Sequence, residues 1–308
     1  MKIICTTVIR AASQGDTHGG LYVIDMDSEE TLHHAPYSED FVNDNERGGE
    51  RGLRGIAVLD DRIIVADSSG LMELDRDNFK ITNRIQDDNI FKSVHEICFF
   101  DKNLWITSTA YDKIVEMDLD FKLQGVWEVI GEDGEDRKIL TDLKPSNPTP
   151  PKTEDKYHIN SISSNNGRVV FSGLITHLYS TEDMDVVAPM PVVNNERSFQ
   201  HNFYEYEDLC LINLTTFGYL GIIKKDSPKI NYVVIPKSKK VKYSADQIAA
   251  NNWNRGLARK DNYILIGTSP ARILLYNMDT NQIEKEVQLE EDVRHCIHGL
   301  EILDENLN

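Results

Sequence analysis

Short apolar runs separated by polar turns recur along the chain, and one two-run phrase appears six times. Each copy begins with a polar residue, and its two apolar runs are joined by a turn, which predicts a β-hairpin. The copies are RGIAVLDDRIIVAD from Arg54, HEICFFDKNLWITST from His95, NSISSNNGRVVFSG from Asn160, HNFYEYEDLCLINL from His201, RGLARKDNYILIGT from Arg255 and HGLEILDENLN from His298. Hairpins repeated at intervals of roughly 40–60 residues indicate a radial β-architecture.

Further strand-like runs follow each complete hairpin, as in RILLYNMD and IEKEVQLE after the fifth copy. Four-stranded antiparallel units repeated around a channel make a β-propeller. The sequence therefore predicts an all-β, six-bladed β-propeller, with five or seven blades as alternatives. The last copy supplies only an innermost strand, and KIICTTVI, GGLYVIDMD and EETLHHAP at the N-terminus supply the other three. We therefore expect both termini to close the final blade.

A single domain over residues 1–308 is predicted. Its blades span about 52–88, 93–128, 157–192, 199–236, 252–290, and 295–308 together with 1–37. The longest predicted loops emerge where the innermost strands begin, and long loops in a compact fold often bind ligands. These loops are 38–51, 129–156, 185–198 and 236–251. The face that carries them is the expected functional face.

Charge and composition restrict the partners. A net charge of −18 argues against nucleic acid, which is bound through Lys and Arg, and against anionic membranes. The same charge is typical of a soluble monomer. No apolar run approaches the about 20 residues of a membrane span, and MKIICTTVIR does not look like a leader peptide. The four cysteines lack CxxC spacing, so we expect a reducing, cytoplasmic location.

The residues that lead the copies would form a ring around the propeller axis. His95, His201 and His298 alternate around that ring, so three imidazoles would converge. Three imidazoles with open coordination positions are typical of a catalytic divalent metal, here Zn, Mn, Fe or Ni. The alternative is a polar channel without a tightly bound metal.

The remaining members of the predicted ring suggest a small anionic ligand. Arg54 and Arg255 would hold a carboxylate or phosphate, with Asn160 and Asn202 as orienting residues. The alternative for the two arginines is internal pairing, and the candidate partners are Glu96, Glu301 and Asp67. Glu96 and His158 are the candidate catalytic acid and base, since each lies within two residues of the ring.

Four stretches resemble an uncharacterised bacterial six-bladed β-propeller family of unknown function: HEICFFDKNLWITST, HINSISSNNGRVVFSG, NRGLARKDNYILIGTS and HGLEIL. The resemblance covers about residues 50–303 and departs at Ser161, where that family has Gly. The architecture is also similar to gluconolactonase-like and NHL-type propellers. The gluconolactonase group implies a divalent ion held by carboxylate and Asn ligands, and the ring predicted here lacks that acidic set. A peptidylglycine amide lyase implies three histidines around zinc, which is closer to this ring.

The sequence thus predicts a metal-dependent lyase or hydrolase that acts on a small anionic substrate in the central channel. The alternative is a non-catalytic propeller that binds a protein or a metabolite through its loop-rich face.

Overall fold

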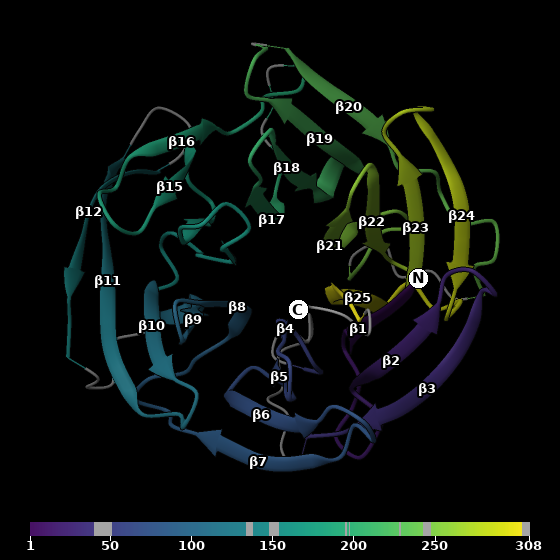
Figure 1. Ribbon diagram of the computed structural model, residues 1–308, viewed down its shortest axis with the longest axis horizontal. Helices are drawn as coiled ribbons and strands as arrows, with labels where there is room; N and C mark the ends of the chain where they lie inside the picture. The colour runs from purple at the N-terminus through teal and green to yellow at the C-terminus, as the bar shows by residue number, and fades with distance from the viewer. Residues whose placement is uncertain are drawn as a thin grey trace. The chain divides into compact units, whose positions relative to one another are not determined.

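The structure, a computed structural model, describes residues 1–39, 51–133, 138–147, 154–194, 196, 198–227, 229–242 and 248–303. Within these residues the chain forms 25 β-strands and two short 3₁₀ helices. The strands make six antiparallel sheets (Figure 1), and the predicted six-bladed β-propeller is confirmed. The described residues contain no helix long and apolar enough to cross a membrane.

Consecutive strands of one sheet are neighbours in the chain, apart from the last sheet. The first blade contains β4 (Ile56–Val58), β5 (Arg62–Ala66), β6 (Gly70–Asp75) and β7 (Ile81–Gln86). The second contains β8 (Val94–Phe100), β9 (Asn103–Ser108), η1 (Thr109–Tyr111), β10 (Lys113–Asp118), β11 (Leu123–Asp133) and β12 (Lys138–Pro145). The third contains β13 (Ser161–Ser163), β14 (Val170–Ser172), β15 (His177–Ser180) and β16 (Val186–Pro189). The fourth contains β17 (Gln200–Glu205), β18 (Leu209–Leu214), η2 (Thr215–Phe217), β19 (Tyr219–Lys224) and β20 (Ile230–Val234). The fifth contains β21 (Asn254–Lys260), β22 (Tyr263–Thr268), β23 (Arg272–Asn277) and β24 (Gln282–Gln288).

The sixth blade is built from both ends of the chain, as predicted. Its strand order is β25 (His295–Ile302), β1 (Lys2–Ile9), β2 (Gly19–Asp25) and β3 (Glu30–Tyr37). Figure 1 shows β25 beside β1, with β2 and β3 following outward. Antiparallel pairing aligns Ile3 with Ile302 and Ile9 with His295, so the C-terminal strand is held by the N-terminal strand over its whole length.

One blade departs from the four-stranded expectation. β12 pairs with β11 and adds a fifth strand to the second blade. The prediction of a loop over 129–156 is therefore wrong for the part that forms the end of β11 and β12. KILTDLKP carries the apolar residues Ile139, Leu140 and Leu143, and its Pro145 lies at the strand end, where a proline is compatible with sheet pairing.

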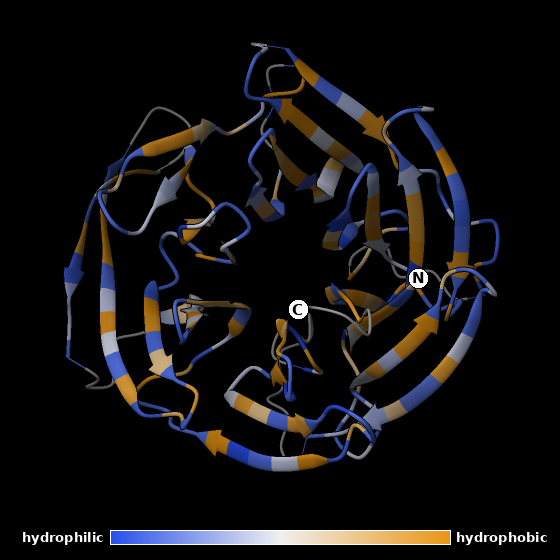
Figure 2. Cartoon of the chain, in the orientation of Figure 1, coloured by the Kyte–Doolittle hydropathy of each residue, from blue (hydrophilic) through white to orange (hydrophobic). Residues whose placement is uncertain are grey.

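Burial along the strands follows their position in the blade. Middle strands such as β18 and β23 are buried at every residue, whereas the outer strands β7 and β24 are mostly exposed or alternate. Figure 2 shows a similar contrast, with mostly hydrophobic colouring on β23 and alternating bands on the outer strands β3 and β24. A strand covered on both faces has no polar side, which explains the continuous apolar runs.

The chain groups into two compact units. The first unit comprises Met1–Ser68, Met72–Arg84 and Ile235–Asn308, and the second comprises Ser69–Leu71 and Ile85–Val234.

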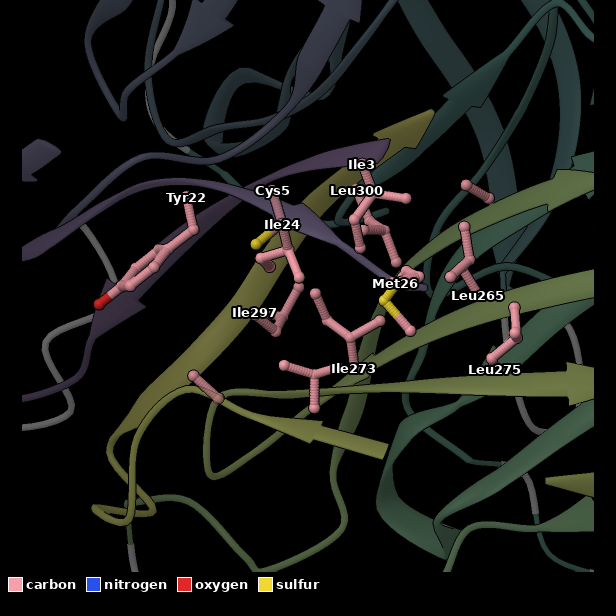
Figure 3. Packing of buried hydrophobic residues seen from close by; sticks show 13 residues of the cluster. Ile3, Cys5, Tyr22, Ile24, Met26, Leu265, Ile273, Leu275, Ile297 and Leu300 are labelled. Atoms are coloured by element: carbon pink, nitrogen blue, oxygen red, sulfur yellow. The ribbon is translucent and has the colours of Figure 1, made fainter. Parts of the chain in front are cut away.

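The apolar core of the first unit joins the two chain ends to the fifth blade. Ile3 and Cys5 of β1 and Ile297 of β25 pack in one buried cluster with Leu265 and Ile273 of the fifth blade (Figure 3). All five side chains are fully buried. Closure of the last blade is thus stabilised by apolar burial as well as by strand pairing.

The Ile297→Ala substitution tests this closure. Because Ile297 is fully buried in the cluster, we expect the free energy of unfolding to fall by about 2–5 kcal/mol. Leu32→Ala on β3 is the control, since Leu32 is 50% exposed, and its effect should stay within about 0.5 kcal/mol. Chemical denaturation of the full chain measures both. Equal effects of the two substitutions would contradict this account of the closure.

Candidate functional site

The six polar residues that lead the repeats, here called the inner-strand residues, lie at or just before the innermost strand of each blade. Arg255 is partly buried and the other five are buried. The first unit holds Arg54, Arg255 and His298, and the second unit holds His95, Asn160 and His201. Buried charged and imidazole groups are uncommon, so these positions are the candidate functional site.

A bulge accompanies three of these residues, His95, His201 and Arg255. The pairing register shifts between Val94 and Ile97, between His201 and Phe203, and between Asn254 and Leu257. A bulge adds an unpaired residue and redirects the side chains around it. In the fourth and fifth blades, the residue that follows the inner-strand residue adopts a left-handed backbone, at Asn202 (φ 50°) and Gly256 (φ 75°). Gly and Asn tolerate that conformation, which explains their place in the repeat.

The first unit brings together a cluster of arginines, Arg10, Arg54 and Arg255, of which Arg54 also faces the carboxyl group of Glu39. Burial lowers the pKa of Arg255 well below its usual range, and repulsion from Arg10 and Arg54 lowers it further. Burial also lowers the pKa of His298 well below 6.5, and the same three arginines add to that shift. His298 is therefore a neutral imidazole at pH 7 that faces guanidinium groups.

Acidic residues do not offset Arg255 within the described part of the chain. No carboxylate is among the groups that set its pKa, and the Nε atom of Arg255 is buried without a hydrogen-bond partner among the described residues. Two of the carboxylates that the sequence offered as partners for Arg54 and Arg255 have other surroundings. Asp67 accepts hydrogen bonds from Arg84 (2.6 Å) and from Tyr37 (2.8 Å). Burial raises the pKa of Glu301 to about 8, and no arginine contributes to that shift.

Three histidines lie close together in the second unit. The ring centroids of His95 and His201 are 6.3 Å apart with nearly parallel planes, and those of His95 and His158 are 5.0 Å apart, edge to face. In each ring the Nδ1 atom contacts an oxygen. These contacts are His95 to the Ser93 carbonyl (2.8 Å), His158 to Asp155 Oδ1 (2.8 Å) and His201 to Thr215 Oγ1 (2.9 Å). A carbonyl accepts only, so His95 carries a proton on Nδ1.

Glu96, the candidate acid or base, lies in a buried polar network next to this group. Its Oε2 atom accepts hydrogen bonds from Asn202 Nδ2 (2.5 Å) and Tyr204 Oη (3.1 Å), and Asn213 Nδ2 donates to Asn202 Oδ1 (3.2 Å). Asn202 therefore contacts Glu96, and the sequence-based role for it, orienting a ligand, stays a prediction.

The side-chain amide of Asn160 uses its donor and leaves its acceptor without a partner among the described residues. Its Nδ2 atom donates to the Gln200 carbonyl (2.9 Å). Its Oδ1 atom is buried and accepts no hydrogen bond from the described residues. Asn160 thus keeps an acceptor for a hydrogen-bond donor in the second unit.

The predicted metal ion remains a prediction. Its three proposed ligands are divided between the units, with His298 in the first and His95 and His201 in the second. Across the described ranges of the chain, no group of three or more His, Cys, Asp or Glu side chains is arranged to hold a metal ion. The Nδ1 contact to a backbone carbonyl at His95 is nevertheless the kind of support that metal-binding histidines receive.

Two relevant residues of these sites escaped the sequence analysis. Arg10 lies just after β1, outside the repeat, and its guanidinium sits 5.5 Å from the ring centroid of Trp253. Tyr204 lies within the fourth repeat, three residues after His201, and it resembled an ordinary apolar strand residue. The one feature of the sequence that could have indicated its role is the tyrosine hydroxyl at a strand position that is expected to be buried.

Comparison with known proteins gives the fold and no family. No family model matches the chain, and no curated protein matches its sequence. A chain of the nidogen/laminin complex has a similar structure, with a TM-score of 0.62 at 7% identity, covering 99% of this chain and 100% of that one. A protein of unknown function from Bacteroides caccae has a TM-score of 0.59 at 10% identity, covering 97% and 98%. A streptogramin B lyase has a TM-score of 0.51 at 12% identity, covering 81% and 93%.

Asn202→Ala tests the buried network around Glu96. The substitution removes a donor to the carboxylate, so we expect a loss of about 1–3 kcal/mol in the free energy of unfolding. Asn281→Ala is the matched control, because Asn281 also has a left-handed backbone (φ 54°) but is exposed, and it accepts a hydrogen bond from Tyr276. Thermal and denaturant unfolding measure the difference. A loss at Asn281 as large as that at Asn202 would assign the effect to the backbone instead.

Proposed function

We propose that this β-propeller binds a small anion at Arg54 and Arg255 and acts on it as a lyase or hydrolase, with His298 as the proton acceptor. The observation that carries the proposal is the guanidinium of Arg255, whose Nε atom is buried without a hydrogen-bond partner among the described residues. This guanidinium faces Arg10 and Arg54, and no described carboxylate contributes to its pKa. A buried charge without an opposite charge is strongly unfavourable. A bound anion would remove that penalty.

The chemistry of the cluster favours a carboxylate or a phosphate. Guanidinium groups bind both with two parallel hydrogen bonds. The protein as a whole is acidic, with a formal charge of −18, so its long-range field repels anions. Selectivity would therefore depend on short-range contacts inside the cluster.

His298 supports the catalytic part of the proposal. A neutral imidazole can take a proton, either from a carbon next to a carboxylate, as a lyase requires, or from water, as a hydrolase requires. The arginines that lower its pKa would be partly neutralised by the bound anion, so binding and proton transfer are coupled. The streptogramin B lyase shares the fold alone, and no step proposed here depends on a metal ion.

Arg255→Gln tests anion binding. Oxalate serves as the probe in isothermal titration calorimetry on the full chain. We expect its affinity to fall about tenfold or more, because a charge-assisted contact is lost. Arg259→Gln, a substitution in the same strand with the same change of charge, should alter the affinity by less than about twofold.

Thermal unfolding distinguishes a binding role of Arg255 from a structural one. Removing a buried cation that is repelled by Arg10 and Arg54 should raise the unfolding temperature of Arg255→Gln without ligand. A lower unfolding temperature together with unchanged oxalate affinity would exclude the binding site proposed here.

Proton uptake on binding tests the role of His298. A bound anion favours the imidazolium, so the pKa of His298 should rise from its depressed value, and the protein should take up part of a proton. Oxalate affinity should therefore increase as the pH falls through the region of that raised pKa. Calorimetry in buffers of different ionisation enthalpy measures the uptake. His298→Gln should abolish the uptake and retain binding, and an unchanged uptake in this variant would refute the assignment. Binding without turnover of any carboxylate or phosphate ester would favour the non-catalytic alternative.

A further inference from the structure

A cavity separate from the arginine cluster lies in the first unit. Its volume is about 390 Å³, and it forms beside the end of β1, the ends of β2 and β3, and the beginning of β25. Its polar and aromatic lining consists mainly of Tyr22, His34, Glu290, Asp292, Arg294 and His295. Cavities of this size that combine apolar walls with a few converging polar groups are typical small-molecule sites.

His295 presents a hydrogen-bond acceptor to this cavity. Its Nε2 atom lies 2.7 Å from Thr7 Oγ1, and that hydroxyl donates to the Gly20 carbonyl. With the Thr7 hydroxyl donating to that carbonyl at 3.3 Å, His295 donates to Thr7 from Nε2. Burial lowers the pKa of His295 to about 4, so the ring is neutral at pH 7. Its Nδ1 atom therefore carries a lone pair.

A second acceptor faces that lone pair. Glu290 Oε1 lies 3.9 Å from His295 Nδ1, which is too long for a direct hydrogen bond. The hydroxyl of Tyr22 donates to the same oxygen at 3.4 Å. The cationic side chain in the lining, Arg294, makes a two-pronged ion pair with Asp292, with a shortest distance of 2.7 Å. Glu290 and His295 thus offer a carboxylate and a lone pair to one incoming donor.

The rest of the cavity suits a hydrocarbon group. The rings of Tyr22 and His34 are stacked, with centroids 4.1 Å apart and planes 11° from parallel. Ile9, Ala12 and Pro36 complete the apolar lining. A ligand with a charged end and a flat or aliphatic body would therefore bury its body against these residues.

We propose that this cavity binds a small primary amine, whose ammonium group donates hydrogen bonds to His295 Nδ1 and Glu290 while its hydrocarbon part lies against Tyr22 and His34. An ammonium supplies the positive charge and the N–H donors that the two acceptors lack. This cavity would bind a cation, whereas the arginine cluster would bind an anion. The proposal for the cavity does not depend on the function proposed for the arginine cluster.

Binding of phenethylammonium to the full chain tests the proposal. We expect saturable binding by calorimetry, and a loss of affinity of about tenfold or more in Glu290→Gln, which removes the charge and keeps the shape. Glu132→Gln on β11 is the matched control, since it changes the net charge equally at an exposed site. It should bind as the unaltered protein does.

A second probe separates hydrogen bonding from charge. Trimethyl(phenethyl)ammonium carries the same charge without N–H donors, so it should bind at least about tenfold more weakly. Nitrogen NMR of the histidine rings should report a shift at His295 Nδ1 on addition of phenethylammonium. Absence of saturable binding, or equal affinity in Glu290→Gln, would overturn the proposal. Binding of Zn²⁺ that requires Glu290, with no binding of the amine, would overturn it in favour of a metal site.

Discussion

The antiparallel pairing of the two chain ends is the interaction on which the first unit depends. β1 and β25 pair from Ile3–Ile302 to Ile9–His295, and this pairing places Thr7 beside His295. Thr6 bridges the same strands and the first blade, because its Oγ1 atom accepts from the Gly299 amide (2.8 Å) and donates to the Arg54 carbonyl. Arg10 follows directly after β1. The cluster of Arg10, Arg54 and Arg255 and the cavity beside His295 would therefore both be lost if this pairing were lost.

The inner-strand residues reflect a conflict between pairing and burial. An innermost strand that continued its regular alternation would direct polar side chains into the apolar contacts between blades. A bulge relieves the conflict, because it leaves one residue unpaired and redirects its neighbours. The positions after His201 and Arg255 adopt the left-handed backbone that such a bulge requires. At Gly299 the Cβ atom of any other residue would collide with the Arg54 carbonyl, so the glycine permits close approach of the sixth and first blades.

The sequence was sufficient for the fold because the signals of the fold are local. Apolar runs of strand length, turns of Asp, Asn and Gly, and a missing innermost strand at one end are all read from neighbouring residues, and they predicted six blades and their closure. β12 was missed because the proline-rich segment beside it favoured a loop. The inner-strand residues could be found from their repeat position. Arg10, Glu290 and His295 could not be assigned roles in the same way, because each contacts residues that are brought near only by the closure of the last blade, as His295 and Thr7 are.

The two sites proposed in the first unit differ in the charge of the ligand that each would bind, although they lie a few residues apart on one sheet. His295 and His298 lie on the same strand, and burial lowers the pKa of both. Their neighbours give the two neutral rings different uses. Arginines surround His298, so an anion is the ligand that lowers the electrostatic cost there. At His295 the group facing the Nδ1 lone pair is the Glu290 carboxylate, so a cation with N–H donors is favoured. Both arrangements cost folding free energy in the absence of a ligand, and such costs are expected where a site is selected for binding and not for stability.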